Sequence, residues 1–293
     1  MVKSSLLEPM NRTKITGLIR LFRPELPFAA GVTVLVGEMV ALGGLPSARQ
    51  TLVGFTCAFL LSSSALILND VFDLKVDLVN APERPLPSGM VSVQDAIWLS
   101  VVVTLGGLVV ALLIGPPVLV FGFFIWVIGF LYNWKFKRSG LPGNLMVAVS
   151  VAACFILGGT TVGDPTNGKV WLLALGAFLI DLAEEIAGDA MDMEGDRLLG
   201  SQSLALRFGR RTALNISAGI FTLLLLLTPL PLFFGWMGIQ YLLAILVADS
   251  GLIYFTIKLL RSQSSKEGVS AMRGIYLGFL AGMLVYILGY LLL

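Results

Sequence analysis

The chain has 293 residues, of which 57% are apolar and only 13% are charged, and its mean hydropathy is +0.90. A soluble domain carries about 25% charged residues, so this composition excludes an ordinary soluble protein and indicates an integral membrane protein. The sequence contains no histidine, which excludes histidine-ligated haem, histidine-bound di-iron centres and histidine proton relays. The net charge of +2 is small, and no nucleic-acid partner is expected.

Residues 1–25 form a basic and mixed N-terminal segment, in which residues 12–24 suit an amphipathic helix at the membrane surface. The first apolar stretch begins near Pro27 and is too long for the apolar part of a cleavable signal peptide. We therefore expect the first span to serve as an uncleaved anchor.

Apolar stretches of about 17–25 residues follow, which is the length of a membrane-spanning helix and not of a barrel strand. In chain order they cover about 26–43, 51–69, 93–114, 117–133, 144–163, 169–188, 212–230, 236–258 and 271–292. The sequence therefore predicts an all-α, polytopic membrane protein with nine transmembrane helices, forming one domain over residues 1–293.

The positions of the basic residues provide a check on this assignment of nine spans. If the spans alternate in direction, 18 of the 20 lysines and arginines lie on one side of the membrane, and only Arg49 and Lys169 lie on the other. Basic loops face the cytoplasm, so we expect a cytoplasmic N-terminus and a C-terminus outside. Cys57 and Cys154 each lie within an apolar stretch, and we interpret them as packing residues and not as a disulfide.

Acidic residues gather in two clusters that together hold ten of the eighteen carboxylates. The first follows the second span and contains Asn69, Asp70, Asp73 and Asp77. The second follows the sixth span and contains Asp181, Glu184, Glu185, Asp189, Asp192, Glu194 and Asp196. Both clusters fall at the cytoplasmic ends of their spans. Carboxylates are costly near a bilayer, so their presence points to a function, most simply the binding of a cation.

The spacing within each cluster supports a metal site. Asn69, Asp73 and Asp77 are four residues apart, and Glu185, Asp189, Asp192 and Asp196 are separated by steps of four, three and four. On a helix each set falls near one face. Oxygen ligands without histidine or cysteine favour Mg²⁺ or Mn²⁺, and Mg²⁺ is commonly shared between carboxylates and substrate phosphates. The clusters therefore predict a phosphorylated substrate.

Basic side chains nearby suit the phosphate groups of such a substrate. Arg84 lies in the proline-rich loop 80–89, and Tyr132, Lys135 and Lys137 lie at the inner end of the fourth span. They could hold a diphosphate beside the metal ions. Glu38 and Asp249 lie inside apolar spans, and no role is assigned to them.

The motif Asn69-Asp-x-x-Asp73-x-x-x-Asp77, the Arg84 loop and Asp189-x-x-Asp192-x-x-x-Asp196 together resemble the UbiA superfamily of intramembrane prenyltransferases. The resemblance covers the whole chain and implies a ring of helices around a central cavity. It implies transfer of a prenyl group from an allylic diphosphate to an acceptor.

The same resemblance implies roles for individual residues. Mg²⁺ and the diphosphate would be held by Asn69, Asp73, Asp77, Asp189 and Asp196, with Asp192 as a further metal ligand. Substrate binding would also involve Asp70, Arg84, Tyr132, Lys135 and Lys137.

Loop 80–89 and residues 132–137 look most like the archaeal digeranylgeranylglyceryl phosphate synthases. This likeness implies geranylgeranyl diphosphate as donor and geranylgeranylglyceryl phosphate as lipid acceptor, at the cytoplasmic side of the cell membrane. Those synthases usually carry basic residues just before the second motif, where this chain has Glu184 and Gly188. An aromatic acceptor therefore stays open. A cation transporter is a further alternative, although the clusters lie at one face and not at mid-membrane.

Overall fold

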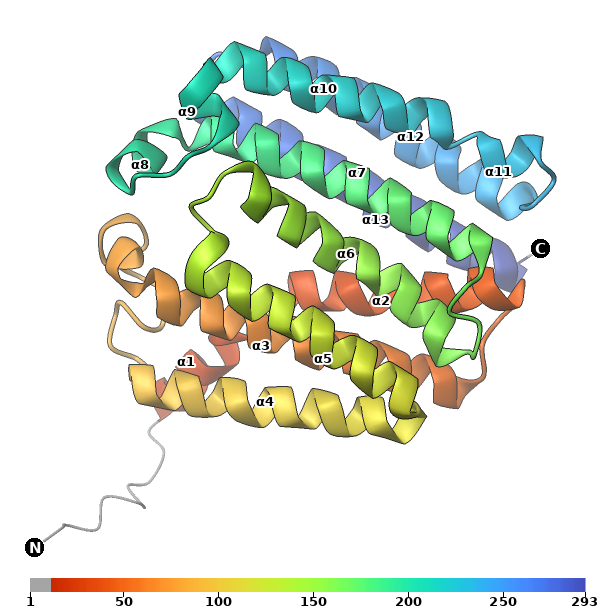
Figure 1. Ribbon diagram of the computed structural model, residues 1–293, viewed down its shortest axis with the longest axis horizontal. Helices are drawn as coiled ribbons and strands as arrows, with labels where there is room; N and C mark the ends of the chain where they lie inside the picture. Colours follow the sequence, from red (N-terminus) through yellow and green to blue (C-terminus); the bar gives the residue numbers. More distant parts are fainter. Residues whose placement is uncertain (1–11, 293) are drawn as a thin grey trace, which may run out of the picture.

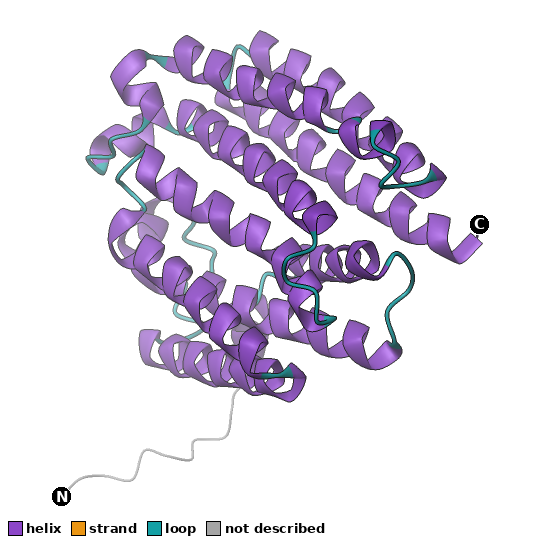
Figure 2. Ribbon diagram, turned by 45° about the vertical axis from the view of Figure 1, so that its right-hand side comes forward, coloured by secondary structure: helices purple, strands orange, loops and turns teal. Residues whose placement is uncertain are grey.

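The structure is a computed structural model that describes residues 12–292, and within this range all regular elements are helical (Figures 1 and 2). The first eleven residues of the expected N-terminal segment lie outside the described part. In chain order the helices are α1 (Arg12–Leu21), α2 (Glu25–Leu42), α3 (Ala48–Asn80), α4 (Val93–Ile114), α5 (Pro116–Leu131), the π-helical η1 (Tyr132–Phe136), α6 (Leu141–Thr161), α7 (Gly168–Met191), α8 (Met193–Leu198), α9 (Leu204–Phe208), α10 (Arg210–Leu227), α11 (Leu230–Phe233), α12 (Ile239–Arg261) and α13 (Ser265–Leu292).

The long helices run side by side, and successive ones pack against each other, as α3 does against α4, α6 against α7 and α12 against α13. Contacts between distant parts of the chain complete the bundle, because α2 packs on α6 and α7 packs on α10 and α13. Helices α8 and α9 lie at the same end of the bundle as the connection from α3 to α4, on the left of Figure 1. This arrangement brings the two acidic clusters to one end of the molecule.

Eight helical segments of the described chain are long and apolar enough to cross a membrane: α2, α3, α4, α5 with η1, α6, α10 with α11, α12 and α13. The protein is therefore an all-helical, multi-pass membrane protein. The remaining long helix, α7, has 24 residues, but Asp181, Glu184, Glu185 and Asp189 lower its hydropathy. A ninth crossing by α7 and the cytoplasmic position of the N-terminus stay predictions.

The outer surface of α4 illustrates the adaptation of the bundle to lipid. Trp98 and Val102 are exposed, whereas Ser100 and Thr104 of the same helix are buried. Ser100 donates a hydrogen bond to the carbonyl oxygen of Ser64 on α3, 3.3 Å away. In lipid, polar groups need partners inside the protein and apolar side chains can face outward.

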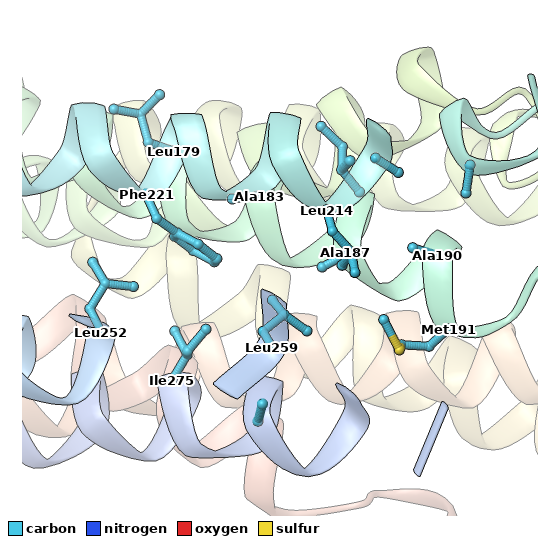
Figure 3. Packing of buried hydrophobic residues seen from close by; sticks show 14 of the residues in the cluster. Leu179, Ala183, Ala187, Ala190, Met191, Leu214, Phe221, Leu252, Leu259 and Ile275 are labelled. Carbon is cyan, nitrogen blue, oxygen red and sulfur yellow. The ribbon is translucent and has the colours of Figure 1, made fainter. Parts of the chain in front are cut away.

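Buried small side chains hold α7 among α10, α12 and α13 (Figure 3). Ala183 and Ala187 of α7 are fully buried, and the larger Phe221 and Leu214 of α10 fill the space beside them. Ser217 of α10 donates to the carbonyl oxygen of Ala183 at 2.8 Å. This packing fixes the α7 face that carries no charge, so the carboxylates of α7 point to its other side.

Glycines allow α2 and α6 to cross closely. A Cβ atom at Gly158 would lie 2.3 Å from the carbonyl oxygen of Val34, and one at Gly37 would lie 2.5 Å from that of Phe155. Both distances are too short for any side chain, so the crossing requires glycine at each position. It closes one wall of the central cavity.

Candidate active site

A cavity of about 890 Å³ lies inside the bundle and is bounded by α2, α3, α5, α6, α7, α12 and α13. Most of its wall is apolar, with residues such as Ala58, Leu61 and Phe155. The polar residues of the wall include Asp73, Tyr132, Lys137, Arg138, Asn144, Asp181, Glu184, Glu185, Asp189, Asp192, Asp196 and, on α12, Asp249. An apolar chamber with a charged region suits a substrate with a long hydrocarbon chain and an ionic head.

The first acidic cluster lies on a single uninterrupted helix, because α3 continues to Asn80. Asn69, Asp73 and Asp77 therefore share the face that their spacing predicts. Only Asp73 of these three lines the cavity, where it forms an ion pair with Lys137. Asn69 lies between the two when its amide nitrogen donates to Asp73 and its oxygen accepts from Lys137, each at 2.9 Å.

A turn of π-helix, η1, shapes the opposite side of this region. Its wider turn is closed by a hydrogen bond from the backbone N–H of Lys137 to the backbone carbonyl oxygen of Tyr132 at 2.8 Å. Both residues line the cavity. Such turns occur frequently at functional sites. The side-chain oxygen of the buried Asn133 lies 2.7 Å from the side-chain amide of Asn69, a contact that was not predicted. Lys135, by contrast, is exposed and does not line the cavity.

The proline-rich loop returns Arg84 to the end of α3. Its Nη1 donates to Asp77 Oδ1 at 2.7 Å and Oδ2 at 2.6 Å, and lies 4.0 Å from Asp70. Asp70 also forms an ion pair with Arg23, which was not predicted as a site residue. Asp70, Asp77, Arg23 and Arg84 therefore form a neutralised group beside the cavity and not on its wall.

The second cluster departs from its predicted geometry. A single helix over residues 185–196 is wrong, because α7 ends at Met191 and Asp192 has left helical geometry, with φ −104° and ψ 16°. Glu185 and Asp189 lie on α7, whereas Asp196 lies on α8. The cavity is nevertheless lined by all three predicted ligands of this motif, Asp189, Asp192 and Asp196.

Two of these carboxylates have distinct surroundings. Asn144 of α6, another residue not predicted, donates to Asp189 Oδ2 at 3.0 Å. Asp196 Oδ2 is buried and has no hydrogen-bond partner among the described residues. Burial, together with the negative charge of Asp192, raises the pKa of Asp196 above its ordinary value.

The donor set fits a hard cation that also takes ligands from a substrate. Within residues 12–292 no three acidic, histidine or cysteine side chains come together closely enough to hold a metal ion unaided. The unpartnered oxygen of Asp196 is nevertheless suited to a cation, and the available donors are oxygens. A Mg²⁺ ion that completes its coordination with phosphate oxygens and water matches this arrangement.

The connection between α8 and α9 is attached to the loop that follows η1. Gln202 donates its backbone N–H to the Arg138 oxygen at 3.1 Å. Gly140 has a φ of +72°, and a Cβ atom there would lie 2.2 Å from the Gln202 oxygen. This close approach holds the second acidic cluster across the cavity from the first.

The residues left without a role have structural partners. Glu38 is fully buried and accepts a hydrogen bond from Thr161 at 2.7 Å, which joins α2 to α6. Asp249 of α12 accepts one from Thr228 at 2.7 Å. Cys57 and Cys154 are both free thiols.

Comparison with known proteins identifies the class to which this fold and site belong. Residues 30–289 match the UbiA prenyltransferase family, and the chain belongs to that family. It is therefore an intramembrane prenyltransferase, which disfavours the cation transporter.

Within this family, the chain is similar to proteins described as digeranylgeranylglyceryl phosphate synthases. The chain is 35% identical over 245 residues to the digeranylgeranylglyceryl phosphate synthase of Thermococcus kodakarensis, covering 84% of this chain and 87% of the relative. A solved structure described as bearing on digeranylgeranylglyceryl phosphate synthase in membranes has a TM-score of 0.76 at 26% identity, covering 96% of this chain and 99% of that one.

A more distant solved structure shares the fold. It is a UbiA homologue from Archaeoglobus fulgidus bound to GPP and Mg²⁺, with a TM-score of 0.66 at 17% identity. The alignment covers 92% of this chain and 99% of that chain.

Proposed function

We propose that this protein transfers a geranylgeranyl group from geranylgeranyl diphosphate to geranylgeranylglyceryl phosphate, forming an ether bond and releasing diphosphate. The observation that carries the proposal is the placement of both acidic motifs, through Asp73 and Asp189, on the wall of one largely apolar cavity. The names of relatives such as the Thermococcus kodakarensis synthase support this choice of acceptor.

In this proposal Mg²⁺ would be held by Asp73, Asp77, Asp189, Asp192 and Asp196, and it would supply positive charge that stabilises the departing diphosphate. Lys137 and Arg84, which pair with Asp73 and Asp77 in the protein alone, turn towards the diphosphate and add charge-assisted hydrogen bonds. Asn69 orients the side chains of Asp73 and Lys137 through its hydrogen bonds to both.

The apolar part of the cavity takes the prenyl chain of the donor. Burial of each CH₂ group contributes about 0.8 kcal/mol to binding. Walls such as Leu61, Phe155 and Ile180 also exclude water, so that the allylic cation reacts with the acceptor and not with water.

The charged end of the cavity opens to the cytoplasm in this proposal, and α7 is the ninth span of a protein in the cell membrane. The basic residues of the connecting loops support that orientation.

The proposal is tested by assaying labelled geranylgeranyl diphosphate with geranylgeranylglyceryl phosphate in detergent with Mg²⁺. The wild-type protein is expected to form the ether product, and Asp73→Asn and Asp189→Asn are expected to lose it. Asp95→Asn is a matched control, because Asp95 pairs with Lys14 and does not line the cavity. Unchanged transfer by Asp73→Asn and Asp189→Asn would refute the proposed site.

An aromatic acceptor is the second candidate, because Glu184 brings negative charge to the cavity wall where a phosphate would be repelled. Incubation with a panel of glyceryl phosphate and aromatic acceptors, followed by mass spectrometry, separates the two. Products from aromatic acceptors alone would replace the ether-lipid assignment.

A further inference from the structure

The helix α7 carries more carboxylates into the cavity than the aspartate motif requires. Asp181, Glu185 and Asp189 are spaced by four residues and lie on one stripe of α7, with Glu184 beside them. All four line the cavity. Only Asp189 belongs to the motif, so Asp181, Glu184 and Glu185 have no part in the metal and diphosphate chemistry described above.

These three carboxylates form no hydrogen bond or ion pair with any residue between 12 and 292. The side-chain oxygens Asp181 Oδ2 and Glu184 Oε1 are also shielded completely. A buried carboxylate without a partner costs several kcal/mol, and native proteins leave few such groups unsatisfied. Their position on the wall of an open chamber indicates that a ligand supplies the missing donors.

Neighbouring side chains also leave their polar atoms available. Tyr132 of η1 lies near Glu185 and Asp181, and Tyr276 of α13 lies near Glu184. Neither tyrosine hydroxyl makes a hydrogen bond within the described chain, and both residues line the cavity. Lys137 is close enough to act on the charge of Glu185 but is already paired with Asp73.

We infer that Asp181, Glu184 and Glu185 form the binding site for the nucleophilic hydroxyl of the acceptor, with Glu185 as the residue that takes its proton. Four residues of α7 separate Glu185 from Asp189, so it lies about 6 Å further along the helix axis from the diphosphate site. That displacement suits an acceptor atom that approaches the allylic carbon beside its leaving group.

The bond between the allylic carbon and the diphosphate oxygen breaks, and the electron pair leaves with the diphosphate. A lone pair of the acceptor hydroxyl forms the new carbon–oxygen bond, the O–H bond breaks, and Glu185 receives the proton. The phosphate of the acceptor would be repelled by these carboxylates and attracted to Arg138, which also lines the cavity.

This inference rests on the proposed function, because it concerns a hydroxyl acceptor. The test compares wild type with Glu185→Gln and Glu185→Asp, using geranylgeranylglyceryl phosphate and an analogue with a thiol in place of the hydroxyl. Loss of a general base is expected to lower kcat by about 10²–10⁴-fold in Glu185→Gln with the hydroxyl acceptor. KM for the prenyl diphosphate should stay unchanged, and Glu185→Asp should retain part of the activity.

The thiol analogue distinguishes proton acceptance from a structural role. A thiol ionises near pH 8.5, far more readily than an alcohol, so it needs little help from a base. Transfer to the thiol by Glu185→Gln should therefore approach that of wild type. Glu194→Gln is the matched control, since Glu194 is exposed on α8 and does not line the cavity.

Folding is checked by thermal unfolding. Because Glu185 forms no hydrogen bond or ion pair with residues 12–292, Glu185→Gln should not lower the unfolding temperature. Wild-type kcat in Glu185→Gln with the hydroxyl acceptor, or equal losses with both acceptors, would overturn this inference alone. A wild-type protein that uses no hydroxyl acceptor would instead overturn the proposed function.

Discussion

Lys137 and Asp73 form an ion pair in the cavity although 64 residues separate them in the chain. The pair joins the first acidic motif on α3 to the segment after η1. In the protein alone each side chain neutralises the other, and a metal ion and a diphosphate can replace both partners.

Replacing Lys137 with methionine should lower kcat/KM for the prenyl diphosphate, because a charged donor to the departing group is lost. Comparable losses of a single donor cost about 10²-fold. Initial rates at varied donor concentration measure the effect. Lys169→Met serves as the control, because Lys169 lies at the opposite end of α7 and does not line the cavity. Equal kcat/KM in the two variants would contradict this role.

Asn144 should matter through Asp189, whose Oδ2 accepts its hydrogen bond at 3.0 Å. Groups that orient metal ligands typically change metal affinity by about 10–100-fold when removed. Asn144→Ala should therefore require more Mg²⁺ for half-maximal transfer, measured by Mg²⁺ titration at saturating donor. Ser150→Ala is matched to it, because Ser150 also lines the cavity but bonds only to Met146 of its own helix. An unchanged Mg²⁺ requirement in Asn144→Ala would exclude this function.

Gly140 should tolerate no side chain. Its φ of +72° is strained for other residues, and a Cβ atom would meet the Gln202 oxygen at 2.2 Å. Gly140→Ala is expected to lower the unfolding temperature more than Gly163→Ala does. Gly163 has a φ of +87° but no atom within 4 Å of the added Cβ, so its variant has the backbone strain alone, about 1 kcal/mol or more. Equal decreases in unfolding temperature in the two variants would show that the contact with Gln202 does not contribute to stability.

Removal of divalent metal should abolish transfer without unfolding the protein. Asp73 and Asp77 are already paired with Lys137 and Arg84, so the first motif does not depend on a metal for charge balance. EDTA should stop product formation, and Mg²⁺ or Mn²⁺ should restore it, because both prefer oxygen ligands. The unfolding temperature should change little. Transfer that persists in EDTA would contradict the metal requirement.

The sequence predicts local geometry here better than contacts across the bundle. Asn69, Asp73 and Asp77 could be placed on one helical face because the period of a helix is fixed and α3 is uninterrupted. The end of α7 at Met191 could not be predicted in this way, because no proline or glycine in the sequence marks the residue at which the helix ends.

Partners across the bundle depend on tertiary packing. Asn133 ends one apolar stretch and Asn144 begins the next, and only the structure shows that they contact Asn69 and Asp189. A polar amide at the end of a span is itself a weak signal, because it needs a partner when it is buried. The pairing of Asp70 with Arg23 likewise depends on where α1 leads into α2.

The four carboxylates of α7 also bear on how the protein enters the membrane. An aspartate at the centre of a helix opposes insertion by about 2.5–3.5 kcal/mol, so α7 is poorly suited to leave the insertion machinery by itself. A connection of only six residues joins it to the apolar α6, against which it packs. We therefore expect α6 and α7 to insert as a hairpin, with α7 shielded from lipid as later helices arrive. With α7 as the ninth span, the residues that make the cavity acidic would thus impose an order on the biogenesis of the bundle.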